Sequence, residues 1–321
     1  MNPNLDAPPR VWVLNLDAEH ELEVGAGYAP TRHLRAIVAR ESARLRGNLV
    51  GEHDVVLGIV QGDAELTPEA RERLRGAEGL CWCPTPRALA RLAAAGVSPG
   101  AVPDAAILTT VNARPFAAAV RAPLAGASFE KHVATTLEEA LVRLVQPASD
   151  GWLVRRTFGA AGRGRRRMHA GRPSAEELAW LVASLRRGPL VLEPWVAIVR
   201  EYTRSAWVTR AGEVVISPPC FQETTRAGAW VRTAEAERGA VRHDDDRRLE
   251  EAVAAAGAAL ARAGYFGPFG IDAFRHRGRE GEVLNPLSEI NARFTMDWLT
   301  GMGRPRGAKL LERSASLARL G

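Results

Sequence analysis

Apolar and polar positions divide the chain into two parts with different patterns. In the first hundred residues, short apolar runs alternate with segments of helical periodicity. The expected strands are residues 11–16, 54–60 and 80–84, and the expected helices are residues 33–45, 68–75 and 86–95. Such alternation predicts a parallel sheet with helices packed against it.

The pattern changes after an alanine-rich stretch with helical periodicity at residues 116–144. Short runs with strand character follow at residues 152–156, 167–169, 190–194, 200–209 and 213–217, with one helix expected at residues 174–187. A long helix, residues 246–263, precedes two final strands at residues 267–276 and 282–291. The second part therefore predicts a mixed sheet that is separate from the first.

The composition is that of a soluble globular protein. Apolar residues make up 46% and charged residues 25% of the 321 residues, which is enough to form the cores of two or three domains. The chain has no run of about eighteen apolar residues, and residues 1–10 lack the basic and apolar segments of a secretion signal. We therefore expect a cytoplasmic protein without a membrane partner. The three cysteines, Cys81, Cys83 and Cys220, have neither disulfide nor zinc spacing.

Basic residues give the chain a net charge of +6, and nearly all of them are arginine, with lysine only at Lys131 and Lys309. The arginines are spread among acidic residues and are locally dense only at residues 163–167, inside a glycine-rich segment. This distribution favours a small phosphate-bearing ligand, so no nucleic-acid partner is expected. A homodimer is the default expectation for the assembly.

A glycine-rich loop follows the strand expected at residues 152–156. Gly159, Gly162 and Gly164 would let backbone N–H groups turn towards an anion, and Arg155 adds a positive charge beside them. The segment matches neither the P-loop nor the dinucleotide fingerprint. Taken alone, it is equally consistent with an ordinary turn.

The most specific motif lies on the two final strands. Glu289, Asn291 and Arg293 alternate along one strand, so their side chains share a face. Asp272 lies on the preceding strand. Two carboxylates and an amide oxygen form an all-oxygen set suited to Mg²⁺, for which a half-solvated strand is the alternative interpretation.

Two further segments carry closely spaced carboxylates. An apolar strand ends at Glu193, and Glu201 follows shortly after; a salt-bridged strand edge is the alternative explanation for this pair. The acidic run at residues 15–21 follows the first expected strand. Ligands often bind at such strand ends, so this run is a candidate site for a cationic substrate, although an acidic surface loop is the more common outcome.

In their order and spacing, these motifs resemble those of the ATP-grasp superfamily over roughly residues 110–300. The loop resembles the one that covers phosphates, although Arg155 and Arg156 replace its usual lysine and proline. The Glu-x-Asn-x-Arg element is similar to that of biotin carboxylase and carboxylate–amine ligases. The resemblance implies an α/β protein with an N-terminal Rossmann-like pre-ATP-grasp domain, residues 1–110, and a two-lobed ATP-grasp fold. The central lobe would be residues 111–194 and the C-terminal lobe residues 195–321.

The resemblance also implies roles for individual residues. The residues implied to bind ATP are Arg114, Arg155, Gly159, Gly162 and Gly164 at the phosphates, Glu193, Pro194, Trp195 and Val196 at the adenine, and Glu201 at the ribose. The residues implied to bind Mg²⁺, expected as two ions with Mn²⁺ as an alternative, are Asp272, Glu289 and Asn291. Arg293 and Arg155 are the candidate catalytic residues, and Arg293 would hold a substrate carboxylate or a developing oxyanion.

The activity implied is that of an ATP-dependent ligase. A small-molecule carboxylate would be activated as an acyl phosphate and then joined to an amine, or less often a thiol, with release of ADP and phosphate. A small-molecule kinase of the same fold and an ATP-binding protein without turnover are the alternatives, and the lysine-to-arginine replacements speak for the second. Loops at residues 17–32, 218–232 and 294–306 are expected to determine substrate specificity. Their sequences do not identify the substrates.

Overall fold

The structure is a computed structural model of the 321-residue chain. It describes residues 10–46, 49–58, 67–124, 131–148, 150–159, 162–225, 230–237, 239–303, 307 and 310–311. The end of the strand expected at residues 54–60 lies outside the described residues, as do Lys309 and the end of the loop expected at residues 294–306.

The N-terminal part contains a parallel sheet, as the alternating pattern predicts. Its strands are β1 (Val11–Val13), β2 (Val55–Leu57), β3 (Glu78–Cys81) and β4 (Ser98–Pro99), in the order β2-β1-β3-β4. The helices that follow them are α2 (Arg32–Ala43), α3 (Pro68–Arg73) and α4 (Pro86–Ala94). Val11 and Val13 of β1 are buried in one core cluster with Ala88 and Leu92 of α4. The expectation of a loop at residues 17–32 is wrong in its first part, which forms α1 (Ala18–Val24) and the short helix η1 (Gly25–Gly27).

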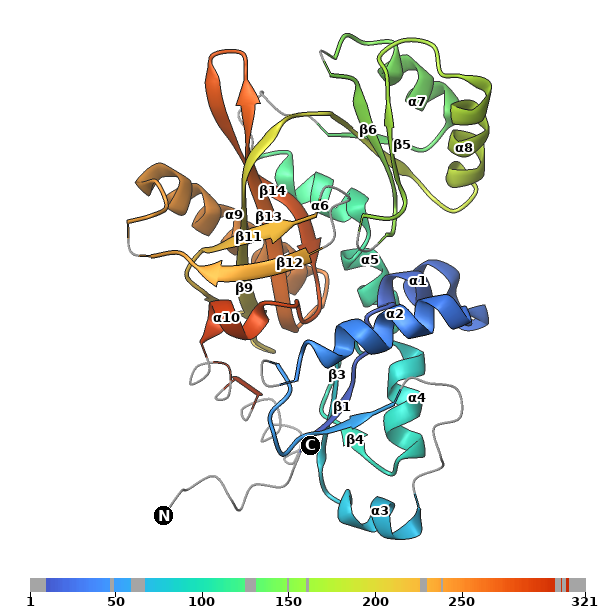
Figure 1. Ribbon diagram of the computed structural model, residues 1–321, viewed down its shortest axis with the longest axis vertical. Coiled ribbons are helices and arrows are strands. Elements are labelled where there is room, and N and C mark those ends of the chain that lie inside the picture. The colour runs from blue at the N-terminus through green and yellow to red at the C-terminus, as the bar shows by residue number, and fades with distance from the viewer. Residues whose placement is uncertain are drawn as a thin grey trace.

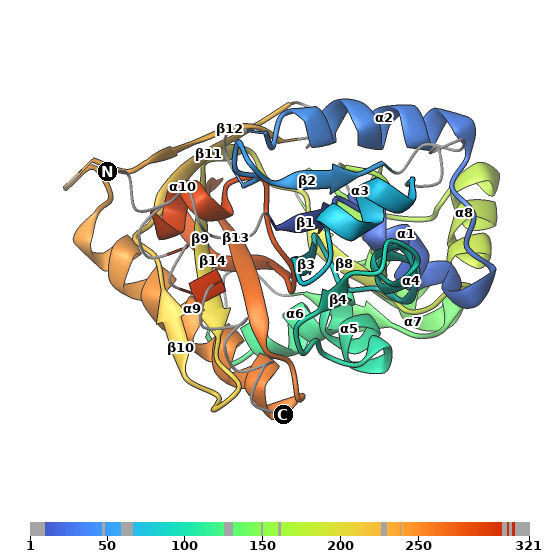
Figure 2. The same cartoon turned by 90° about the horizontal axis from the view of Figure 1, so that it is seen from below.

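The central part is an antiparallel sheet with helices on one face. Its strands are β5 (His132–Ala134), β8 (Leu190–Pro194), β6 (Trp152–Arg156) and β7 (Arg165–Met168), in that order. Helices α7 (Leu137–Leu144) and α8 (Ala175–Leu185) begin with capping boxes at Thr136 and Ser174. Both helices lie on the outer side of this sheet, so its other face is turned towards the C-terminal sheet (Figure 1 and Figure 2).

The C-terminal part is a six-stranded antiparallel sheet with the order β12-β11-β9-β13-β14, in which β10 also pairs with β9. The strands are β9 (Ile198–Val208), β10 (Val214–Ile216), β11 (Cys220–Thr224), β12 (Trp230–Glu235), β13 (Gly267–Gly278) and β14 (Gly281–Asn291). Helix α9 (His243–Arg262) packs its alanine-rich face against this sheet, and α10 (Trp298–Met302) follows β14. The loop expected at residues 218–232 is therefore wrong in part, because β11 and the start of β12 occupy it.

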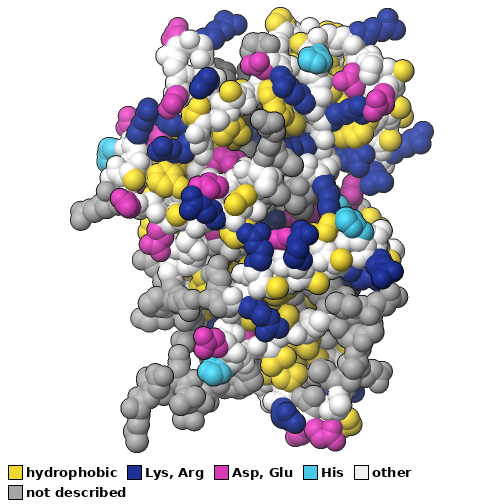
Figure 3. Space-filling model, viewed as in Figure 1, with side chains coloured by type: hydrophobic (Ala, Val, Ile, Leu, Met, Phe, Trp, Pro, Cys, Tyr) yellow, Lys and Arg dark blue, Asp and Glu magenta, His cyan; other side chains and the backbone are white. Residues whose placement is uncertain are grey.

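Two short helices join the three sheets. Helices α5 (Ala105–Val111) and α6 (Arg114–Arg121) run between the N-terminal sheet and the two others (Figure 1). Basic and acidic side chains are interspersed on the face of the molecule shown in Figure 3. Within the described part of the chain, no helix is both long and apolar enough to cross a membrane.

Candidate active site

A cleft of about 500 Å³ lies between the central and C-terminal sheets, which is a usual size for a small-molecule site. It collects residues that are far apart in the sequence. The residues expected at the site that line it are Arg155, Glu193, Pro194, Trp195, Val196, Glu201, Asp272 and Glu289. Arg114, Gly159 and Asn291 line a narrower pocket that adjoins the cleft at Glu289.

Residues 193–196, which are implied to bind the adenine and are called the hinge from here on, lie where β8 leaves the central sheet and the chain crosses to β9. The backbone N–H of Trp195 donates to the carbonyl of Gly151, at 2.8 Å, which holds this crossing against the central lobe. The Arg167 guanidinium stacks over the Trp195 ring, 4.7 Å from its centroid. Glu201 lies on β9 across the cleft and accepts a hydrogen bond from the Thr224 hydroxyl at 2.7 Å. The hinge and the second carboxylate thus face the same cleft.

Two arginines meet at Glu289. Arg114 Nε lies 2.9 Å from Glu289 Oε1, and Arg155 forms a second ion pair with the same oxygen. Burial lowers the pKa values of both arginines to about 10, so both stay charged at neutral pH. Glu289 therefore lies between two cations, and Arg155 also pairs with Glu193 through its other terminal nitrogen.

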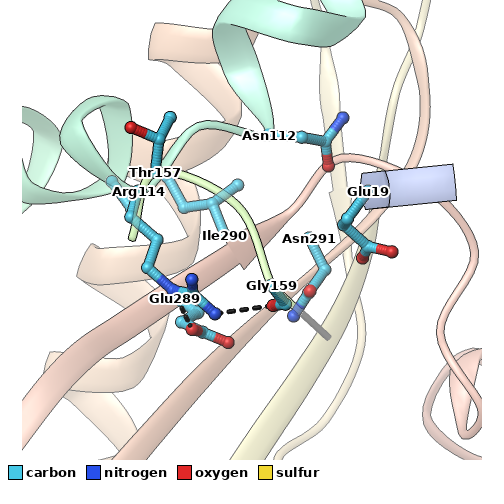
Figure 4. A pocket seen from close by; sticks show the side chains of 9 residues that line it. Glu19, Asn112, Arg114, Thr157, Gly159, Glu289, Ile290 and Asn291 are labelled. Carbon is cyan, nitrogen blue, oxygen red and sulfur yellow. Dashed lines mark hydrogen bonds and ion pairs between the residues drawn. The ribbon is translucent and has the colours of Figure 1, made fainter. Parts of the chain in front are cut away.

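The glycine loop is tied to the same cluster through Arg114. Arg114 donates to the carbonyl of Arg156 at 2.8 Å. It also donates to the carbonyl of Gly159 at 2.6 Å (Figure 4). A Cβ atom on Gly159 would lie 2.4 Å from the Arg163 carbonyl oxygen, so only glycine fits there. Gly162 and Gly164 have left-handed φ values of 77° and 70°, which glycine adopts without strain. The structure therefore brings Arg114 to the loop and to Glu289.

The expected metal ligands lie on neighbouring strands. Asp272 of β13 is paired in register with Glu289 of β14, and Asn291 donates to Asp272 at 3.1 Å. Burial, with a smaller contribution from the carboxylate of Asp297, raises the pKa of Asp272 to about 7. A carboxylate with a raised pKa and hard oxygen neighbours fits a divalent cation such as Mg²⁺. Among the described residues, no group of three His, Cys, Asp or Glu side chains could hold a metal, so the set depends on the Asn291 amide.

Arg293 is held by a residue that the sequence interpretation did not connect with it. Glu19 of α1 accepts from Arg293 Nε at 2.7 Å and also from Nη2. Arg293 Nη2 in turn donates to Asn291 Oδ1 at 3.1 Å. Burial alone would lower the pKa of Arg293, but the Glu19 carboxylate raises it above its usual value. The sequence contains no local signal for this contact, because the two residues come from opposite ends of the chain.

The acidic run at residues 15–21 is buried, so the interpretation as a surface loop is wrong. Asp17 and Glu21 are 1% and 5% exposed. Arg87, at the start of α4, donates to Asp17 at 2.7 Å and to Glu21 at 3.3 Å. The Tyr28 hydroxyl also donates to Asp17, at 2.7 Å. These contacts supply the partners that buried carboxylates need.

Lys131 is another residue to which the sequence interpretation assigned no role. Its side chain is 4% exposed and lies beside Glu193 at the back of the cleft. The available signal was compositional, because Lys131 is one of two lysines in a chain whose other basic residues are arginine.

The fold is similar to that of a solved enzyme, although sequence comparisons find no match. No protein-family model matches the sequence, and neither does any curated protein. Among solved structures, biotin carboxylase from Campylobacter jejuni, described as a β-γ-ATP complex, is similar over 95% of this chain and 70% of that chain, with 12% identity and a TM-score of 0.62. This similarity shows that the chain has the ATP-grasp fold, which confirms that part of the prediction. The Rossmann-like character of the N-terminal domain and the domain boundaries stay predictions.

Two further solved structures are less similar. N5-carboxyaminoimidazole ribonucleotide synthetase from Thermus thermophilus has 20% identity and a TM-score of 0.48, and the match covers 89% of this chain and 71% of that chain. D-alanyl-alanine synthetase A from Vibrio cholerae has 15% identity and a TM-score of 0.49, with coverages of 72% and 71%.

Proposed function

We propose that this protein is an ATP-dependent ligase that activates a small-molecule carboxylate as an acyl phosphate and couples it to an amine. The observation that carries the proposal is the single cleft in which the hinge, Arg155, Asp272 and Glu289 meet. The ATP-grasp fold supports it, and biotin carboxylase, which shares this fold, was solved in a complex described as containing β-γ-ATP.

In this proposal ATP lies across the cleft, with its adenine against residues 193–196 and its ribose near Glu201. Arg114, Arg155 and the amides of the loop at Gly159, Gly162 and Gly164 bind the phosphates. Positioning and electrostatics then supply the catalysis. Asp272, Glu289 and Asn291 would hold Mg²⁺, which when bound supplies positive charge at the β- and γ-phosphates.

The reaction has two steps. A carboxylate oxygen of the substrate attacks the γ-phosphorus, the bond to the β,γ-bridging oxygen breaks, and ADP leaves. The lone pair of an amine then attacks the acyl carbon, phosphate leaves with the electrons of the C–O bond, and the amine loses a proton. We further propose that Arg293 stabilises the oxyanion of the second step; its hydrogen bond to Asn291 Oδ1 holds that side chain in position. The glycine loop would exclude water from the acyl phosphate.

The test is a titration of Mg²⁺-ATP into wild type and Glu289→Gln by calorimetry, followed by ADP release with a panel of carboxylates and amines. We expect metal-dependent binding in wild type that is lost in the variant. We also expect substrate-dependent ADP release that Asp272→Asn and Arg293→Ala reduce by at least about 100-fold. Absence of ATP binding to wild type would overturn the proposal, as would full activity of Glu289→Gln.

One observation favours a second candidate, a protein that binds ATP without turning it over. Arg114 and Arg155 both contact Glu289, the central carboxylate of the expected metal set. If these contacts persist when ATP is bound, the carboxylate is not free for a metal. ATP binding that is independent of Mg²⁺ and gives no ADP with any substrate would identify this case. A phosphorylated product that survives added amines would instead identify a kinase.

A further inference from the structure

A buried lysine joins the two lobes at the back of the cleft. Lys131 directly precedes β5, and its Nζ lies 3.3 Å from Glu193 Oε2 on the neighbouring strand β8. The same ammonium donates to the backbone carbonyl of Ser288 on β14, next to Glu289. Lys131 thus contacts the hinge carboxylate in the central lobe and the strand of the C-terminal lobe that carries the expected metal ligands.

Glu193 is held between two cations. Its other oxygen, Oε1, lies 3.2 Å from Arg155 Nη1, and its side chain is 3% exposed. A carboxylate this deeply buried requires a cationic partner, and removal of that partner costs several kcal/mol in typical cases. Lys131 and Arg155 form ion pairs with Glu193, and the charges of Arg121 and Arg114 also interact with this carboxylate.

Arg155 divides its guanidinium between two carboxylates. Nη1 faces Glu193, and Nη2 forms the ion pair with Glu289. In the proposed reaction the same guanidinium must turn to a phosphate. It can leave Glu193 only if another cation stays on that carboxylate, because a buried carboxylate without a partner would otherwise hold it back.

Because of this arrangement, we infer that Lys131 is a positioning residue for nucleotide binding: it keeps Glu193 neutralised so that Arg155 is free to bind a phosphate of ATP. This inference rests on the proposed function. It assigns Lys131 a role through Glu193 and Arg155 and requires no contact between Lys131 and the nucleotide.

The charge state of Lys131 is consistent with this role. Burial lowers the pKa of Lys131 to about 8; Glu193 opposes the shift, while the positive charges of Arg155 and Arg121 add to it. Lys131 is therefore protonated in most molecules at neutral pH. Although burial alone would raise the pKa of Glu193, Lys131 and Arg155 hold it below its usual range, so this carboxylate is charged.

The test compares dissociation constants for Mg²⁺-ATP, measured by calorimetry, in wild type, Lys131→Met, Glu193→Gln and the double variant. Lys131→Met is expected to weaken binding about 10- to 100-fold, the usual loss when a group that supports a ligand-contacting side chain is removed. Glu193→Gln removes the charge that holds Arg155, so the double variant should bind as Glu193→Gln does. Lys131→Arg should recover most of the affinity, and Arg247→Met, an exposed cation on α9, is the matched control.

Two results would overturn the inference while leaving the proposed function intact. Equal ATP binding by wild type and Lys131→Met would show that Lys131 has no role in binding. A double variant that binds as weakly as Lys131→Met would show that Lys131 acts on the nucleotide directly. If Lys131→Met does not fold, Lys131→Gln, which keeps a donor for the Ser288 carbonyl, replaces it with the same expectations. Absence of ATP binding to wild type would instead contradict the proposed function itself.

Discussion

At the scale of single residues, the site holds several charges in surroundings that favour their neutral forms. Arg114, Arg155 and Lys131 have lowered pKa values, and Asp272 has a raised one, in each case mainly because of burial. Such shifts cluster where proteins bind charged ligands, since the ligand then supplies the missing countercharge. Cations with lowered pKa values beside an acid with a raised one are suited to an anionic nucleotide together with a divalent metal.

Asp272 gives a test of this charge balance in the protein without metal. Its folded pKa of about 7 lies above its usual value of 3.8, so the folded state holds a proton that the unfolded state has lost. The contribution of Asp272 to the free energy of unfolding is fully present below about pH 4, where the residue is protonated in both states. This contribution is lost as the pH rises to about 7. Asp272→Asn stays neutral and should exceed wild type in free energy of unfolding by more than about 1.4 kcal/mol at pH 8, the equivalent of one pKa unit.

The measurement is urea unfolding with EDTA present at pH 4 and at pH 8. The two proteins should differ little at pH 4, and added Mg²⁺ should stabilise only wild type. Glu280→Gln, in the exposed turn of the same hairpin, is the control and should change stability by less than about 0.5 kcal/mol. If Asp272→Asn is less stable than wild type at pH 8, the charged Asp272 carboxylate does not destabilise the folded protein as its raised pKa indicates.

At the scale of elements, the glycine loop between β6 and β7 combines left-handed backbone with close contacts. A Cβ atom at Gly164, where φ is 70°, would lie 2.9 Å from the Phe158 carbonyl oxygen. Gly164→Ala should therefore lower the free energy of unfolding by about 1–2 kcal/mol and weaken ATP binding, because the loop amides must move.

A second glycine, Gly76, is a control that separates the loss of stability from the loss of ATP affinity. Gly76 is also left-handed, with φ of 79°, but has open space around it and lies in the N-terminal part, far from the cleft. Gly76→Ala should lower stability by about 1 kcal/mol without any change in ATP affinity. Thermal unfolding and calorimetry on both variants check this; equal affinity in Gly164→Ala and wild type would contradict a phosphate-binding role for the loop.

The elements also show which parts of the fold could be predicted from the sequence. Strands β6, β8, β13 and β14 were predicted close to their observed positions, because each carries a local apolar pattern. Strand β5 was hidden in a segment with helical periodicity, since its three residues are a strand only through their pairing with β8. Strand β11 and the start of β12 were likewise assigned to a loop, although β11 pairs with β9.

The same distinction applies to the candidate site. The glycine spacing and the Glu-x-Asn-x-Arg element are local, so their residues could be named from the sequence. Glu19 and Lys131 act on partners that are distant in the chain, and no local pattern identifies such contacts. The burial of Asp17 and Glu21 was missed for the same reason, because Arg87 is brought to them by the fold.

At the scale of the whole molecule, the hydrophobic cores do not follow the order of the three parts along the chain. The largest core joins Trp12 and Trp82 of the N-terminal part to Ile290, Phe294 and Trp298 of the C-terminal part. The central lobe has a core of its own, around Trp152, Leu181 and Leu192. The N-terminal and C-terminal parts therefore form one packed body, and most of the buried apolar side chains of the central lobe pack into a core of their own.

The Glu19–Arg293 pair lies within this shared body, and its removal tests both assembly and chemistry. The two side chains are 10% and 14% exposed, so Glu19→Gln leaves a buried guanidinium without its carboxylate. We expect the free energy of unfolding to fall by about 3–5 kcal/mol. ADP release should fall as well, because Arg293 would no longer hold Asn291 in place.

Two controls identify the cause of that loss. Glu251→Gln removes half of an exposed pair with Arg247 and should cost less than about 1 kcal/mol. The double variant Glu19→Leu/Arg293→Met removes both charges and should recover much of the stability, since two apolar side chains replace a buried pair at little cost. It should not recover ADP release. Recovery of both properties would mean that Arg293 joins the two parts of the molecule and takes no part in the reaction.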